Sequence, residues 1–284
     1  MATVNRWIGA TTVWDTGTNW SGGAKPANGE VVLFNGGSVV SVATTQDNEQ
    51  GVTLAGLIIE PTYTGDIGSS GVALQIGCQT GNVLHRGSGK LYLKCGTTFT
   101  SPIIIDCVNK TTQVELDCTT VAGTDVEVVR GTVALIGGSA ATEFNRVVVG
   151  WRDDPINDVT MTIASTVTSG SVDLLVINGG VVTNSETTAM CVLSGHGRLV
   201  QSAGVVTDLV VVGGRCNWDF ANGASDAATR VYVVDGIFDF TQTQGQKIIN
   251  TLYEFPNGEV VRMDDNDIHK ITTHRRVKTR FAGE

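Results

Sequence analysis

Short segments rich in β-branched residues recur through the middle of the chain, and each is followed closely by a turn of Gly, Asn, Asp or Thr residues. Six of them are Leu57–Ile59, Leu74–Ile76, Leu91–Leu93, Ile103–Ile105, Val114–Leu116 and Val126–Val128. The first three begin 17 residues apart, and the next three begin 12, 11 and 12 residues later. No stretch of a dozen residues carries the 3.6-residue apolar period of an amphipathic helix. The chain is therefore predicted to be all-β.

The second half of the chain repeats a clearer unit, in which an apolar strand runs into a small-residue turn and then into another strand. The four copies of this unit are 174–182, 199–206, 209–216 and 231–238, and their last glycines are residues 180, 204, 214 and 236. These intervals suit coils of roughly twenty residues that share one core when they stack. The pattern predicts a parallel β-helix, or β-solenoid, with a body over residues 36–245. A β-sandwich or jelly roll with strands every 8–12 residues remains the alternative.

The first 35 residues concentrate large aromatic side chains among turn residues, namely Trp7, Trp14, Trp20 and Phe34. A solenoid must cover the open end of its core, and tryptophans suit that purpose. Residues 1–35 are therefore predicted to form an N-terminal cap.

The same segment carries the motif W-x-G…W…N-W-S-x-G…P…G-E-x-V-x-F. This motif resembles the first coil of β-helical bacteriophage virion proteins and of autotransporter-type β-helices. The resemblance covers about 30 residues, and the remainder is similar only in its valine- and glycine-rich texture. It implies a virion component, such as a head decoration protein or tail appendage, or a surface-displayed passenger domain.

The six cysteines lie in or beside apolar strands, without a C-x-x-C pair and without histidines at zinc-ligand spacing. They are expected to be reduced and buried, and Cys78 and Cys95 are expected to stack on neighbouring coils because they too are 17 residues apart. His85 and His196 stand beside arginine or glycine and are expected in surface turns.

Charge is distributed unevenly along the chain. Residues 269–284 contain five Lys/Arg and one acid, a net of +4, so that the other 268 residues carry −13 of the total of −9. We predict that residues 246–284 form an attachment segment, with Ile271 and Val277 interleaved among the basic residues. The partner-binding residues predicted within it are Lys270, Arg275, Arg276, Lys278, Arg280 and Phe281.

The sequence contains partial matches to two known nucleotide-binding motifs, and each match lacks a required residue. Gly87–Lys90 resembles the end of a phosphate-binding loop but lacks its first glycine, and Gly195–Gly197 lacks the third glycine of a dinucleotide fingerprint. β-helical enzymes that cut polysaccharides are similar in fold, and carboxylates near cations are their candidate equivalents. These candidates are Arg152–Asp154, Glu127 with Arg130, and Asp219 near Arg215.

The sequence thus predicts a structural accessory protein of a bacteriophage particle that decorates or stabilises the capsid exterior. It is expected to be no enzyme, to use no cofactor or metal, and to be located in the virion after assembly in the host cytoplasm. Its expected partners are a capsid or other virion protein, further copies of itself, or a surface glycan. Neither a signal peptide nor a membrane span is expected, and the net charge of −9 argues against nucleic acid. A carbohydrate-binding or polysaccharide-cleaving β-helix is the alternative.

Overall fold

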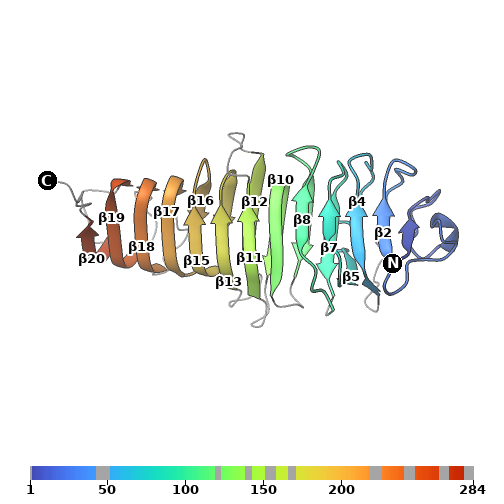
Figure 1. Ribbon diagram of the computed structural model, residues 1–284, viewed down its shortest axis with the longest axis horizontal. Coiled ribbons are helices and arrows are strands. Elements are labelled where there is room, and N and C mark those ends of the chain that lie inside the picture. Colours follow the sequence, from blue (N-terminus) through green and yellow to red (C-terminus); the bar gives the residue numbers. More distant parts are fainter. Residues whose placement is uncertain are drawn as a thin grey trace.

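The computed structural model describes residues 2–42, 52–96, 98–118, 123–137, 143–150, 158–165, 171–217, 226–239, 247–261 and 269–277. Successive coils stack along one long axis, with the N-terminus near one end of the rod and the C-terminus at the other (Figure 1). Every pairing between the named strands is parallel, and the described residues hold one short 3-10 helix, η1 (Gly17–Asn19), and no α-helix. The predicted parallel β-solenoid is confirmed, and the β-sandwich alternative is wrong.

The strands form two continuous parallel ladders. The first ladder contains, in order, β1 (Val4–Arg6), β2 (Val31–Phe34), β4 (Gly56–Ile59), β6 (Val83–His85), β8 (Ile103–Asp106), β10 (Thr124–Gly137), β11 (Glu143–Val149), β13 (Ser171–Ile177), β15 (Thr187–Leu193), β17 (Val206–Asn217), β18 (Asp226–Asp239), β19 (Lys247–Val261) and β20 (His269–Arg276). The second ladder contains β3 (Thr53–Leu54), β5 (Leu74–Cys78), β7 (Leu91–Cys95), β9 (Gln113–Asp117), the end of β10, β12 (Val159–Ser165), β14 (Val181–Asn184), β16 (Arg198–Gln201) and the ends of β17, β18 and β19. From β2 to β19, each coil therefore contributes one strand, or half of a long strand, to each ladder, whereas β1 and β20 lie in the first ladder.

Alternate residues of the strands point inward and stack in register through the rod. In the first ladder one such inward column runs through Val32, Leu57, Val83, Ile103, Val126, Val147, Leu175, Cys191, Leu209, Val231 and Leu252, all buried. Burying one such side chain contributes about 1.5–3 kcal/mol. The stacked columns thus form the single continuous core that a lone coil could not build.

Coil length varies, although the register within the ladders is kept. Partner residues of adjacent coils are separated by as few as 16 positions, from Leu175 to Cys191, and by as many as 28, from Val147 to Leu175. The 17-residue spacing of the early segments is therefore not the coil repeat. Leu57 lies in the first ladder, whereas Leu74 lies in the second and pairs with Leu93.

Glycines mark the corners of the late coils, in a register that differs from the predicted one. The structure aligns Gly180, Gly197, Gly214 and Gly236, because Arg198 pairs with Val181 and Arg215 pairs with Arg198 and Ile237. Gly214 has a φ of +74°, and a Cβ there would lie 2.4 Å from the carbonyl oxygen of Gly197. Gly204 belongs to the separate turn after β16.

The aromatic residues of the first coils pack together in the part of the core beside β1 and β2. Trp7, Trp14 and Trp20 are at most 1% exposed. The Trp20 ring centroid lies 4.6 Å from that of Trp14 and 4.9 Å from that of Trp7, and Phe34 lies 5.0 Å from Tyr63. The tryptophan contacts are edge-to-face and the Phe34–Tyr63 contact is tilted, and together these rings pack beside the first paired strands, β1 and β2.

The motif residues that carried the resemblance have structural roles beside this aromatic cluster. Asn19 is 2% exposed and its Nδ2 donates to the Thr11 hydroxyl and the Val13 carbonyl, each at 2.7 Å. A Cβ on Gly9 would lie 2.3 Å from the Trp7 ring, so that the glycine makes room for the indole. The motif therefore specifies how the first coil closes.

All six cysteines are buried and none of them forms a disulfide, as expected. The expected stacking of Cys78 on Cys95 is wrong, because Cys95 pairs in register with Ile76, and Cys78 pairs with Leu54. The Sγ of Cys95 instead lies 3.3 Å from that of Cys118.

The sequence predicted that the solenoid body ends at residue 245. The ladder pairing continues beyond that residue. β19 pairs with β18 over residues 247–261, and β20 pairs with β19 over residues 269–276. Both strands are therefore coils of the solenoid. Within the described part of the chain, no helix is long and apolar enough to cross a membrane.

Candidate functional site: the outer face of the last coils

Three of the six predicted partner-binding residues lie on β20, and three lie outside the described residues. Lys270, Arg275 and Arg276 belong to this strand, whereas Lys278, Arg280 and Phe281 are not described. Among the described strands, β20 is the last of the first ladder and pairs on one side only, with β19. The predicted basic segment thus begins as an edge strand of the sheet.

The inward column changes from apolar to polar where it reaches β20. His274 stands in register with buried Leu252 and lies 2.8 Å, Nε2 to Oε2, from Glu254. The same Glu254 oxygen accepts from Arg276 Nε at 3.2 Å, and Glu254 follows Val233 in register. One carboxylate therefore holds a histidine and an arginine across the end of the apolar core.

An outward column on the same coils stacks two tyrosines and an arginine. Val210, Tyr232, Tyr253 and Arg275 occupy successive in-register positions on β17 to β20. The tyrosine rings are 4.7 Å apart and within 4° of parallel, and the Arg275 guanidinium carbon lies 5.8 Å from the Tyr253 ring centroid. Tyr253 is therefore covered on both faces, whereas on its other side Tyr232 has the smaller side chain of Val210 as its neighbour in the column.

The adjacent outward column contains an ion pair. Arg230 Nη2 donates to Asp208 Oδ2 at 2.5 Å, and the two residues are in register on β18 and β17. The Asp208 side chain is 16% exposed and that of Arg230 is 47% exposed. Asp208 Oδ1 is buried and has no hydrogen-bond partner among the described residues. The carboxylate thus keeps unused acceptor capacity below an accessible guanidinium.

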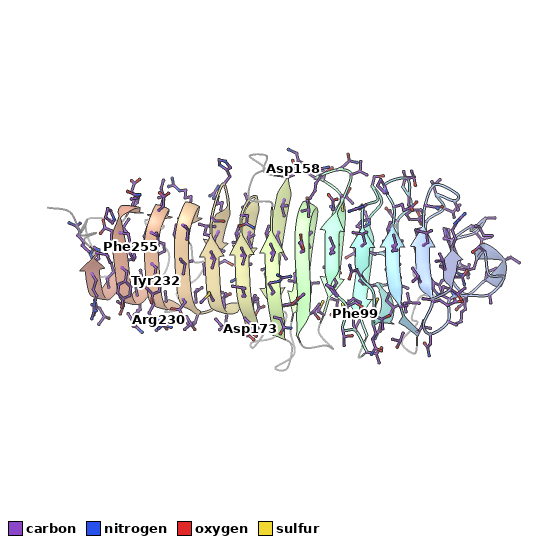
Figure 2. All side chains as sticks on the ribbon, in the orientation of Figure 1. Phe99, Asp158, Asp173, Arg230, Tyr232 and Phe255 are labelled. Atoms are coloured by element: carbon purple, nitrogen blue, oxygen red, sulfur yellow. The ribbon has the colours of Figure 1, made fainter. Side chains whose placement is uncertain are left out.

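A hollow of about 340 Å³ lies between these two columns. Its lining consists of Met190, Asp208, Val210, Arg230, Tyr232 and Val234. Figure 2 shows Arg230 and Tyr232 on the coils near the C-terminal end of the rod. The hollow exists because Val210 is much shorter than Tyr232, its neighbour on the next coil.

A second hollow, of about 260 Å³, lies on the outer face of the second ladder. Tyr92, Glu115, Ala134 and Thr162 occupy successive in-register positions there, and all of them line the hollow. Burial, followed by the charge of Asp117, raises the pKa of Glu115 above its ordinary value. Neither hollow could be predicted from the sequence, because neither set of lining residues is close together in the chain.

The structure describes some of the residues that were candidates for polysaccharide cleavage, and others lie outside the described ranges. Arg130 pairs with Asp158 at 3.2 Å, and Arg215 forms an ion pair with Asp239, so both cations have carboxylate partners other than the predicted ones. Arg152–Asp154 and Asp219 lie outside the described residues. No group of three or more His, Cys, Asp or Glu among the described residues could hold a metal ion.

The histidines differ in position. His196 is exposed in a turn, as expected, whereas His85 is 1% exposed and points inward from β6, so its expected surface position is wrong. Burial lowers the pKa of His85 to about 4, which keeps its imidazole neutral in the core.

Comparison of the chain with protein-family models, with curated proteins and with solved structures found no match in any of the three.

Proposed function

We propose that the chain is a structural accessory module of a virus particle, attached through its last coils to an acidic protein surface. The observation that carries the attachment is the edge strand β20, which brings Arg275 and Arg276 to the end of the ladder opposite the aromatic cap. The virion setting rests on the resemblance of the N-terminal motif.

The proposed attachment has two physical components. An edge strand presents unpaired backbone N–H and C=O groups, to which a partner strand can pair. Arg275 and Arg276 on this strand favour an acidic partner and repel the same basic strand of a second copy. Surface ion pairs contribute only about 0.2–1 kcal/mol each, so that backbone pairing and apolar contacts should supply most of the affinity. Salt is therefore expected to weaken attachment without abolishing it.

The test reverses the two described charges of β20 in the double variant Arg275→Glu, Arg276→Glu. Incorporation into particles assembled without the native chain is expected to fall at least tenfold, because repulsion replaces attraction at the contact. The control is Arg86→Glu, Arg146→Glu, which changes the net charge equally on exposed residues in other coils. Incorporation that matches the control would refute attachment through β20, provided that circular dichroism shows both variants folded.

A second candidate function, glycan binding, is supported by the hollow beside Tyr232. An aromatic ring face packs well against the C–H face of a pyranose, while a neighbouring carboxylate and guanidinium accept from and donate to hydroxyls. Tyr232, Asp208 and Arg230 supply these three groups around the hollow. Asp208 is the one carboxylate among the lining residues, whereas glycoside hydrolysis ordinarily requires two. The arrangement therefore favours binding over cleavage.

The glycan candidate predicts that Tyr232→Ala weakens binding to bacterial surface polysaccharides about tenfold or more in a glycan array followed by calorimetry. Tyr92→Ala is the matched control, because Tyr92 is an outward tyrosine of the other ladder. Equal losses in both variants, or no binding by the native chain, would contradict a site at Tyr232. Incubation with the same polysaccharides and measurement of chain length tests for cleavage.

A further inference from the structure

Two cysteines from adjacent coils meet inside the core. Cys95 ends β7, and Cys118 directly follows β9, whose last register pair with β7 is Lys94 with Asp117. Both thiols are fully buried, and their sulfur atoms are 3.3 Å apart. By contrast, Cys191 lies between Leu175 and Leu209 in its column and has no cysteine in register on either side.

The backbone geometry at this pair suits a covalent link. Adjacent strands of a sheet lie about 4.8 Å apart, within the usual Cα separation of disulfides of about 4.4–6.8 Å. A disulfide bond is about 2.05 Å long, so that the sulfurs need to approach by little more than an ångström. We propose that Cys95 and Cys118 are an oxidation site and form an inter-coil disulfide when the rod meets a peroxide oxidant. This inference is independent of the proposed attachment and of glycan binding.

The reaction balances with hydrogen peroxide alone. One thiolate attacks the peroxide, the O–O bond breaks, and a sulfenic acid and water form. The second thiol then attacks the sulfenic sulfur, the S–S bond forms and a second water leaves. Two thiols are oxidised and one peroxide is reduced to two waters.

The burial of the pair determines how fast this reaction proceeds. Burial, followed by the hydrogen bond with Cys118, raises the pKa of Cys95 well above its ordinary value. The thiolate is the reactive form, so oxidation should be slow at neutral pH and faster at higher pH. Because both thiols are fully buried, a small oxidant such as hydrogen peroxide suits the reaction. The link, once formed, would hold the coils of β7 and β9 together and close a loop that includes β8.

The experiment exposes the folded chain to hydrogen peroxide at pH 7 and pH 9, quenches it, and counts thiols after denaturation without reductant. Of the six thiols, two are expected to disappear, sooner at pH 9. Tryptic cleavage after Lys94, Lys110 and Arg130 places Cys95 in peptide 95–110 and Cys118 in peptide 111–130, which should appear as one linked pair. Because peptide 95–110 also contains Cys107, the map is repeated with Cys107→Ala.

Matched variants separate the pair from the other cysteines. Cys191→Ala should still lose two thiols and give the same linked peptides, whereas Cys118→Ala should give no link between 95–110 and another peptide. Retention of all six thiols at both pH values would overturn the proposal. A link from Cys95 to Cys78, or oxidation of both residues without a link, would overturn it equally.

Discussion

At the scale of single residues, His85 shows how the ladder register determines chemistry. It stands between Ile59 and Ile105 in an inward column of the first ladder, whose other positions are apolar from Phe34 as far as Val233. A neutral imidazole is tolerated there, but a protonated one would carry an uncompensated charge in the core. The position therefore couples the stability of the rod to acid.

The free energy of unfolding is predicted to depend on pH through His85. Its pKa is about 4 when folded, against about 6.5 when unfolded, so the unfolded chain binds more protons between these values. The contribution of the neutral side chain to the free energy of unfolding is fully present above pH 6.5. It is lost as the pH falls from 6.5 through 4, and the loss amounts to about 3 kcal/mol. Denaturant unfolding at pH 7 and pH 4 should show this loss, and His85→Leu should reduce it by about that amount.

The control for this measurement is His196→Leu, because His196 is exposed in a turn. It should keep the native difference between the two pH values. If His85→Leu also keeps that difference, the buried imidazole is not the source of the acid sensitivity.

The sequence predicted burial of the cysteines but placed His85 at the surface, and the reason is physical. Cysteine behaves as a small apolar residue wherever it lies in an apolar strand. The position of a histidine depends on which face its strand turns inward, and this face is fixed by pairing with Ile59 and Ile105 rather than by its own neighbours in the chain.

At the scale of elements, the short segments rich in β-branched residues predicted the strands but not their partners. Leu74 and Leu91 begin segments that are 17 residues apart, yet Leu74 pairs with Leu93, since the turns between strands differ in length. Gly204 was likewise aligned with corner glycines although it lies in another turn. Local pattern identifies a strand, whereas register depends on loop lengths that no local pattern reports.

The N-terminal cap is predicted to keep the first coils from associating. Deletion of residues 1–35 removes β1, β2 and three buried tryptophans and uncovers the edge of β4. Light scattering after size-exclusion chromatography should then detect larger species, because edge strands pair with one another. Ile8→Ala, at a residue that is 45% exposed within the intact cap, should elute like the native chain. A truncated chain that elutes and melts like the native one would show that the cap is dispensable.

At the scale of the whole molecule, the rod has two chemically different ends. The N-terminal end is closed by tryptophans, and the last described strand carries cations and the Glu254–His274 contact. The net charge of +4 over residues 269–284 indicated that the C-terminal segment differs from the body. On that basis Arg275 and Arg276 were predicted to bind a partner. The stacking of Tyr232 on Tyr253 was not predictable, because residues 21 positions apart become neighbours only once the length of that coil is known.

The unequal coils imply that the length of the rod depends on the number of stacked coils and not on the number of residues in each. Each coil advances the axis by one strand spacing, about 4.8 Å, whether it uses 16 residues or 28. Extra residues inserted in a loop would widen the rod locally and leave its reach unchanged, whereas a duplicated coil would lengthen it by one fixed step. The length of the rod and the size of its surface loops can therefore evolve separately in such a chain.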